Sequence, residues 1–170
     1  MDQTDWERRI AAAWASFDEL SETDFLALIE KLAAELPTDS GVGWFERASS
    51  LDATDHPDMA ITLYEQALER GLPAGRRRQA VIQLASSLRL AGRAPESAAL
   101  LAAELDGTSD DLNDAVVAFL ALALADMGQE REAAAAALAA LAPHLSQYQV
   151  SVANYARQLA EPGKASGSPG

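Results

Sequence analysis

The chain has 170 residues, of which 49% are hydrophobic but only 6% are aromatic, and its formal net charge is −13. Because it contains no cysteine, disulfides, thiolate nucleophiles and zinc–thiolate sites are excluded. Its 26 acidic residues against 13 basic ones argue against nucleic acid or an anionic membrane as a partner, since phosphate binding requires clustered Lys and Arg.

The N-terminus and the apolar runs bear on localisation. The first ten residues, MDQTDWERRI, lack the basic-then-apolar plan of a signal peptide. The longest strongly apolar run, residues 115–125, is about half as long as a membrane span requires. We therefore expect a cytoplasmic protein that makes no membrane contact.

Apolar residues at helical spacing predict helices along the first part of the chain and no strand of useful length. Ser21, with Asp24 three residues on, resembles a capping box that starts the second helix. Pro37 ends that helix, and Gly71 is expected to end the fourth one in a left-handed conformation. The helices expected here cover residues 5–20, 21–36, 42–54 and 58–70.

The same helical periodicity continues through the second part of the chain. Thr108 with Asp111, and Ser146 with Gln149, have the spacing of helix caps. Gly92 and Gly128 follow apolar stripes and are expected to close two of the helices. These helices are expected over residues 76–91, 95–105, 112–127, 130–141 and 146–160.

The last expected helix carries an apolar face opposite a polar one. The apolar face comprises Tyr148, Val152, Tyr155 and Leu159.

Residues 161–170, which follow this helix, are rich in Pro, Gly and Ser, so we expect a disordered tail.

Small residues recur at a nearly fixed interval. Ala48, Ala85 and Ala121 are spaced 37 and then 36 residues apart, and each is followed three residues later by Leu and twelve residues later by another small residue. Small side chains at a helix crossing let two helices pack closely, so this interval predicts stacked helical hairpins, that is, a solenoid. The followers are Leu51, Leu88 and Leu124, and Ala60, Ser97 and Ala133.

These positions resemble the tetratricopeptide repeat, whose pattern is W-x2-L-G-x2-Y followed by A-x3-F and P. Trp44-x2-Arg47-Ala48-x2-Leu51 and Ala60-x3-Tyr64 match it in the first unit. The next two units contain Leu84-Ala85-x2-Leu88 with Ser97-x3-Leu101, and Leu120-Ala121-x2-Leu124 with Ala133-x3-Ala137. The second and third units depart from the family pattern because they lack its Trp. The repeat period of this chain also exceeds the usual 34 residues.

The resemblance covers residues 41–142, and the whole chain is also similar to the bacterial proteins grouped as tetratrico-peptide repeat group 5. It implies an all-α, right-handed α-solenoid of antiparallel helix pairs. We expect a single domain over residues 1–160, with a helix pair at 5–36 that is either a degenerate repeat or a cap. The three units are expected at about 41–72, 76–105 and 110–142, with a capping helix at 146–160.

The first helix of each unit in such a solenoid lines a concave groove, and the side opposite the small residues should face it. We therefore expect a non-enzymatic interaction scaffold that binds a peptide or helical segment of a protein partner there. Some family members clamp a partner's terminal carboxylates with Lys and Asn in this groove, but the matching positions here hold neither. The expected partner-binding residues are Phe45, Ser49, Gln79, Gln83, Ser86, Arg89 and Phe119.

Two further features leave alternatives open. Arg76, together with the arginines that follow up to Arg93, could bind partner carboxylates or could be solvated. Trp6, Trp14 and Phe17 could pack against the second helix or form a surface for self-association. Self-association through this helix or through the terminal faces of the protein is the alternative function. No Ser/His/Asp set, paired-carboxylate motif or Gly-rich phosphate loop stands out, so we expect neither catalysis nor a metal or cofactor site.

Overall fold

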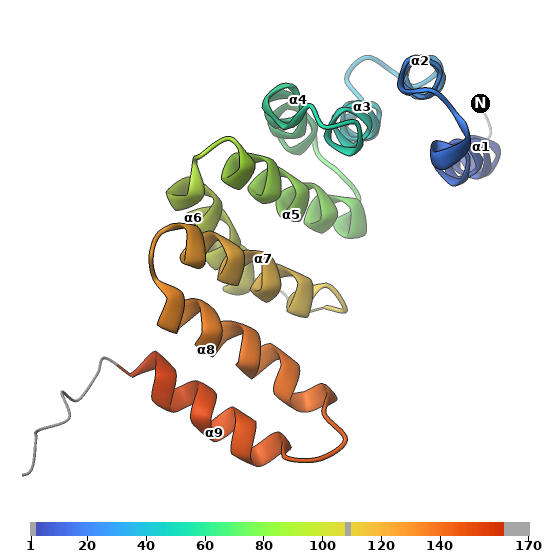
Figure 1. Ribbon diagram of the computed structural model, residues 1–170. Helices are drawn as coiled ribbons and strands as arrows, with labels where there is room; N and C mark the ends of the chain where they lie inside the picture. The colour runs from blue at the N-terminus through green and yellow to red at the C-terminus, as the bar shows by residue number, and fades with distance from the viewer. Residues whose placement is uncertain (1–2, 108–109, 162–170) are drawn as a thin grey trace, which may run out of the picture. The chain divides into compact units, whose positions relative to one another are not determined.

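The computed structural model describes residues 3–107 and 110–161, and the secondary structure of these ranges is helical (Figure 1). Helices that are neighbours in sequence pack antiparallel within each part of the chain, which confirms the expected all-α repeat fold. Within the described ranges, no helix combines the length and the hydropathy needed to cross a membrane. The α-helices are α1 (Gln3–Ala15), α2 (Glu22–Ala33), α3 (Gly41–Ala53), α4 (Pro57–Arg70), α5 (Ala74–Leu90), α6 (Ala94–Leu105), α7 (Asn113–Asp126), α8 (Glu130–Leu141) and α9 (Gln149–Ala160).

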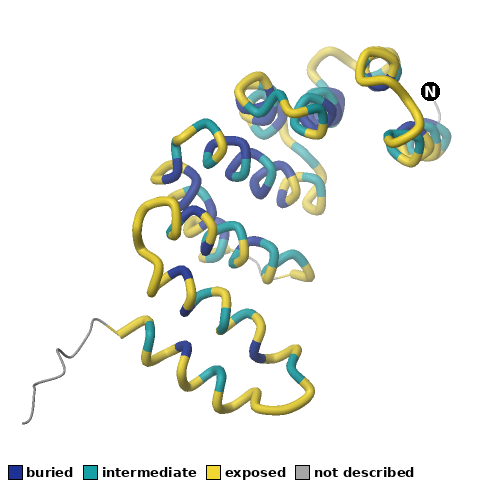
Figure 2. Tube along the Cα trace, viewed as in Figure 1, coloured by how far each residue is buried: buried dark blue, intermediate teal, exposed yellow. Residues whose placement is uncertain are grey.

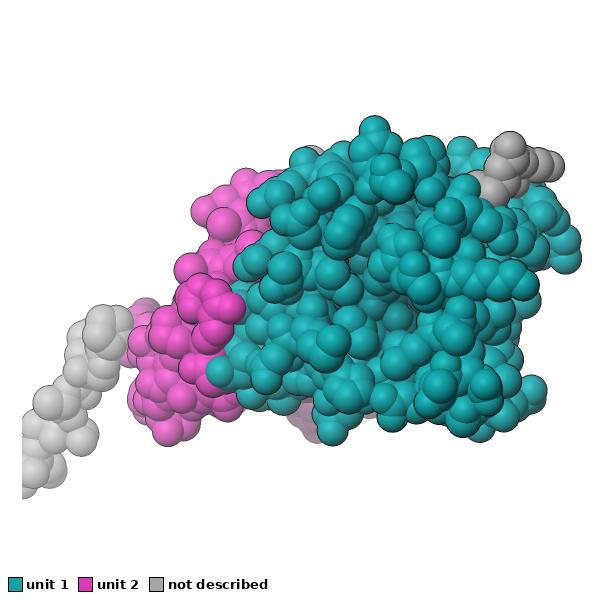
Figure 3. All heavy atoms as spheres, turned by 90° about the horizontal axis from the view of Figure 1, so that it is seen from above, with its two compact units in different colours: residues 1–91 teal, residues 92–170 magenta. Residues whose placement is uncertain are grey.

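The chain divides into two compact units, Met1–Ala91 and Gly92–Gly170 (Figure 3). Unit 1 contains α1–α5 and unit 2 contains α6–α9, each with its own helix packing. The boundary falls between α5 and α6, inside the second expected repeat. The expected single domain over residues 1–160 stays a prediction.

The small residues singled out by their spacing are buried in both units. In unit 1, Ala48 of α3 and Ala60 of α4 are buried, and these two helices form the most extensive helix contact of the unit. In unit 2, Ala121 of α7 and Ala133 of α8 are buried in the same way. Because an alanine side chain occupies little volume at a helix crossing, the backbones of the two helices in each pair can approach closely. The repeat interval in the sequence therefore marks helix crossings, as predicted.

Several helix boundaries follow the expected local signals. The Ser21 hydroxyl accepts a hydrogen bond from the backbone N–H of Asp24 at 3.2 Å, which confirms the cap of α2. Pro57 occupies the first turn of α4, where its missing N–H costs nothing. Gly71, which follows α4, has a φ of 85°, a value that glycine adopts without steric cost.

Other boundaries differ from the prediction. The first helix ends at Ala15, and a short 3-10 turn over Phe17–Glu19 replaces its last turn. Ser146 does not cap α9: the helix begins at Gln149, whose side-chain amide instead donates to the carbonyls of Pro143 and Leu145. The cap expected from Thr108 involves a residue outside the described ranges, and so do residues 162–170 of the expected tail.

The aromatic residues of α1 pack within unit 1. Trp6 is only 1% exposed, and its indole N–H donates to the Leu32 carbonyl of α2 at 2.8 Å. The rings of Trp14 and Phe17 meet Phe25 edge-on, with centroids 5.1 and 4.8 Å away. Of the two alternatives for these residues, the structure shows the packing role. Trp6 therefore offers no surface for self-association.

Candidate peptide-binding cleft

A cleft of about 420 Å³ opens in unit 1, where side chains of α1, α3 and α5 converge. Four of the residues expected to bind a partner line it, namely Phe45 and Ser49 from α3 and Gln79 and Gln83 from α5. The helix that the sequence placed outside the repeats supplies the third wall. The other lining residues are Glu7, Ile10, Ala11, Trp14, Glu46 and Arg76.

The floor of the cleft is held by a hydrogen-bond network that extends into the core. Phe45 and Ser49 are buried, and the Phe45 ring lies 6.2 Å from the ring of Tyr64 on α4. The Gln83 side-chain oxygen accepts hydrogen bonds from the Ser49 hydroxyl at 3.0 Å and from the Tyr64 hydroxyl at 2.8 Å. Burial raises the pKa of Tyr64 above its usual value, so its hydroxyl stays protonated as a donor. Gln83 is thereby fixed in position at the cleft.

One wall of the cleft is an ion cluster. The Arg76 guanidinium donates to both carboxylate oxygens of Glu7, at 2.8 and 2.6 Å, and its Nε lies 3.4 Å from the Glu46 carboxylate. Glu46 is only 3% exposed and also accepts a hydrogen bond from the Trp14 indole at 2.8 Å. Burial raises the pKa of Glu46, while the hydrogen bond from Trp14 and the charge of Arg76 oppose that rise. The sequence left open whether Arg76 binds partner carboxylates. In the structure its guanidinium forms ion pairs within the chain, with Glu7 and Glu46.

The remaining expected residues are not in this cleft. Ser86 and Arg89 lie further along α5 and do not line it. Phe119 lies on α7 in unit 2, where it is half-buried. Arg78, another member of the arginine cluster, is buried.

The contribution of α1 could not be read from the sequence. Trp14 and Ala11 lie on a helix that does not match the repeat pattern, and nothing in their spacing indicates that they face α3 and α5. A lone acidic residue such as Glu46 is also usually solvent-exposed, so its burial gave no signal in advance. Both features follow from the tertiary packing of α1 against the first repeat.

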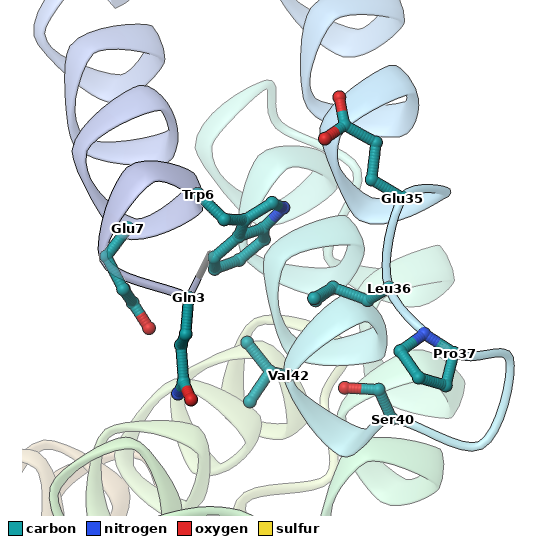
Figure 4. Close-up of a pocket in the computed structure, with 8 residues that line it drawn as sticks. All are labelled: Gln3, Trp6, Glu7, Glu35, Leu36, Pro37, Ser40 and Val42. Atoms are coloured by element: carbon teal, nitrogen blue, oxygen red, sulfur yellow. The ribbon is translucent and has the colours of Figure 1, made fainter. Parts of the chain in front are cut away.

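A second cavity of unit 1, with a volume of about 510 Å³, lies beside the loop between α2 and α3 (Figure 4). Its apolar wall is formed by Trp6, Leu36 and Val42, and Glu7 and Glu35 lie at its edge (Figure 4). Although this cavity is larger, both carboxylates are already paired with arginines, and the Trp6 N–H is taken by Leu32. We regard the first cleft as the better candidate for recognition because it brings together four of the expected partner-binding residues, whereas this cavity contains none of them.

Comparison with known proteins agrees with this architecture. The family model described as Tetratrico peptide repeat matches residues 41–159, which extends past the expected repeats into α9. No curated protein and no solved structure matches the chain. Because the matched range covers more than half of the sequence and coincides with the stacked helical hairpins, the chain belongs to the Tetratrico peptide repeat family.

Proposed function

We propose that the protein binds a peptide segment of a protein partner in the cleft between α1, α3 and α5. Tetratrico peptide repeat domains are generally protein–protein interaction modules and are typically non-catalytic. The observation that carries the proposal is the convergence of Phe45, Gln79 and Gln83 on one cleft in unit 1. Phe45 on α3 is far in sequence from Gln79 and Gln83 on α5, and the packing of the two helices brings it beside them.

The chemistry of the cleft suits a peptide backbone beside an apolar side chain. Gln79 and Gln83 lie one turn apart on α5, and a primary amide both donates and accepts hydrogen bonds, as the peptide group does. Gln79 is exposed, so its amide can meet a ligand without first breaking a buried contact. Ile10, Trp14 and Phe45 provide apolar surface beside these amides, as interface cores commonly do.

The charge of the cleft restricts the segment it can accept. Two carboxylates, Glu7 and Glu46, face one guanidinium, Arg76, so the lining has a formal excess of one negative charge. A partner carboxylate would be repelled, which agrees with the missing carboxylate clamp. The proposed ligand is therefore an uncharged or weakly basic segment.

Ala11 offers a way to block the cleft without removing any existing contact. It is exposed on α1 and lines the cleft, so Ala11→Trp adds bulk at the point of ligand entry. Ala12 is exposed on the same helix but borders a different depression, beside Arg9 and Leu28, so Ala12→Trp is the matched control.

The experiment is affinity capture from the native cell with the wild type and both variants, followed by titration of peptides from the captured partner. We expect Ala11→Trp to lose the partner and Ala12→Trp to retain it, with the isolated peptide binding the wild type. Equal retention by the two variants would place recognition elsewhere on the molecule and would refute the proposed cleft.

A further inference from the structure

The candidate cleft and the second cavity of unit 1 follow one another along α1 and α3. On both helices, the residues that line only the second cavity come earlier in the chain than those that line only the cleft. Glu7 lines both cavities, so they meet at this side chain. The order is Gln3 and Trp6, then Ile10 and Trp14 along α1, and Val42, then Phe45 along α3.

The two cavities lie about as far apart as alternate side chains of an extended peptide. The lining of the second cavity centres on Trp6 in α1 and Val42 in α3, and that of the cleft centres on Ala11 and Glu46. At about 1.5 Å per residue, these centres are separated by about 7.5 Å along α1 and about 6 Å along α3. Alternate residues of an extended chain lie about 7 Å apart, and their side chains point to the same side. One such chain can therefore place a side chain in each cavity.

The ion pair at the junction of the two cavities offers hydrogen bonds to a peptide backbone. The Arg76 guanidinium donates to both carboxylate oxygens of Glu7, and its Nε faces Glu46. A guanidinium has five N–H donors, so these contacts leave two of them to a ligand, and each carboxylate oxygen can accept a further bond. A peptide group that crosses the pair can donate its N–H to Glu7 and accept a hydrogen bond from Arg76.

We propose that the cleft and the second cavity are consecutive subsites for one extended, internal segment of a protein partner. Two apolar side chains of the segment, two residues apart, occupy the two cavities, and the backbone between them crosses the Glu7–Arg76 pair. The inference rests on the proposed function, because the cleft is one of the two subsites. It adds the first turn of α1 and the loop between α2 and α3 to the binding surface. Both lie outside residues 41–159, which the family model matches.

The second cavity suits an apolar side chain that enters from solvent. The loop between α2 and α3 is exposed over most of its length (Figure 2), so the cavity is accessible beside it. Leu36 and Val42 in the apolar wall are only half-buried, so each leaves part of its surface for a ligand to cover. An apolar side chain of the partner would bury this surface together with its own.

The charges around the second cavity exclude acidic segments. Glu7 and Glu35 lie at its edge (Figure 4), and hydrogen bonds from arginines lower the pKa of each, so both carboxylates are ionised at neutral pH. With Glu46, the two subsites together contain three carboxylates and one guanidinium, that of Arg76. A terminal carboxylate, or an Asp or Glu beside the apolar residues, would be repelled. The segment is therefore internal to the partner and free of acidic residues at the site.

Selection from a random library of short peptides, capped at both ends, tests this pattern on the full-length protein. We expect enrichment of peptides that carry apolar residues at two positions, two residues apart, and no acidic residue between them. Enrichment of a single apolar position, or of another spacing, would overturn the arrangement of two subsites. A library without any enrichment would refute the proposed cleft as well.

Blocking each cavity in turn assigns the two peptide positions. Gln3 is exposed on α1 and lines only the second cavity, so Gln3→Trp blocks that cavity, as Ala11→Trp blocks the cleft. Ala12→Trp is again the control, because Ala12 lines neither cavity. In calorimetric titrations with an enriched peptide, we expect Gln3→Trp to weaken binding at least roughly tenfold and Ala12→Trp to leave it unchanged.

A truncated peptide completes the test. Replacing the apolar residue of the second cavity by alanine should weaken binding to the wild type at least roughly tenfold, and this comparison does not depend on the folding of a variant. The same replacement should have almost no effect on binding to Gln3→Trp, whose cavity is already filled. If Ala11→Trp abolishes binding but Gln3→Trp and both truncations do not weaken it, the cleft stands and the second subsite is refuted. If neither protein variant weakens binding, the proposed function fails with it.

Discussion

Substitution of Gly41 by alanine provides a direct test of how closely α3 and α4 pack. Gly41 is the first residue of α3 and is buried against the end of α4. A Cβ atom at this position would lie 2.2 Å from the Gly71 carbonyl oxygen and 2.7 Å from that of Ala67. Both neighbours are backbone atoms, so neither can rotate away as a flexible side chain would. The helices must separate to accept a single methyl group.

The expected cost follows from that separation. Ordinary contact would require the Cβ to lie about 1 Å further from the Gly71 oxygen, and overpacking of this kind costs about 1–3 kcal/mol. The loss of backbone freedom in the unfolded chain on replacing glycine offsets at most ~1 kcal/mol. We therefore expect a net loss of about 1 kcal/mol, which lowers the melting temperature of a unit of this size by roughly 6 °C.

Urea unfolding followed by far-UV circular dichroism measures this loss. The matched control is Gly75→Ala in the first turn of α5, where an added Cβ meets no atom within 4 Å. Because alanine is the better helix former, the control should gain about 0.5–1 kcal/mol. If Gly41→Ala is as stable as Gly75→Ala, then α3 does not approach α4 as closely as the structure shows. The position of Phe45 and Ser49 on the floor of the cleft would then also be in question.

Three further changes test the packing and the ion cluster. Tyr64→Phe removes the hydroxyl that donates to Gln83, and a loss of about 1–2 kcal/mol in urea unfolding is expected. Ala133→Leu overpacks the α7–α8 crossing and should cost about 1–3 kcal/mol, whereas Ala134→Leu at an exposed position should be nearly neutral. Arg76→Met leaves the buried Glu46 carboxylate without the Arg76 guanidinium, which raises the pKa of Glu46 further above its value in the unfolded chain. The variant should therefore keep its stability at acidic pH, where Glu46 is protonated, and lose it as the pH rises towards neutrality. A loss of about 1–3 kcal/mol at neutral pH that does not shrink on acidification would contradict that assignment.

The helical architecture could be predicted from local patterns because those patterns act over one or two turns. The apolar periodicity placed every α-helix of the described ranges to within a few residues, and Gly71 ended α4 as its position indicated. One failure lies at the start of α9. The helix begins only at Gln149, after Tyr148 in a left-handed conformation with a φ of 67°, so Ser146 is too early in the chain to cap it.

The candidate cleft was predicted only in part. Periodicity identified the sides of α3 and α5 that face away from the small residues, and these sides supplied Phe45, Gln79 and Gln83. It could not indicate that α1 would close the cleft with Trp14. That contact depends on the angle at which α1 packs, and residues outside the repeat pattern carry no signal for this angle.

The sequence by itself determined that this protein is a stack of helical hairpins, because the interval between Ala48, Ala85 and Ala121 records the spacing of helix crossings. Only the tertiary structure decided how the charged and aromatic residues are used. It buried Glu46 between Trp14 and Arg76, and it left Tyr155 exposed on an apolar stripe that the periodicity alone would bury. The physical reason is that helical periodicity fixes which residues share a face, whereas burial depends on whether another helix covers that face.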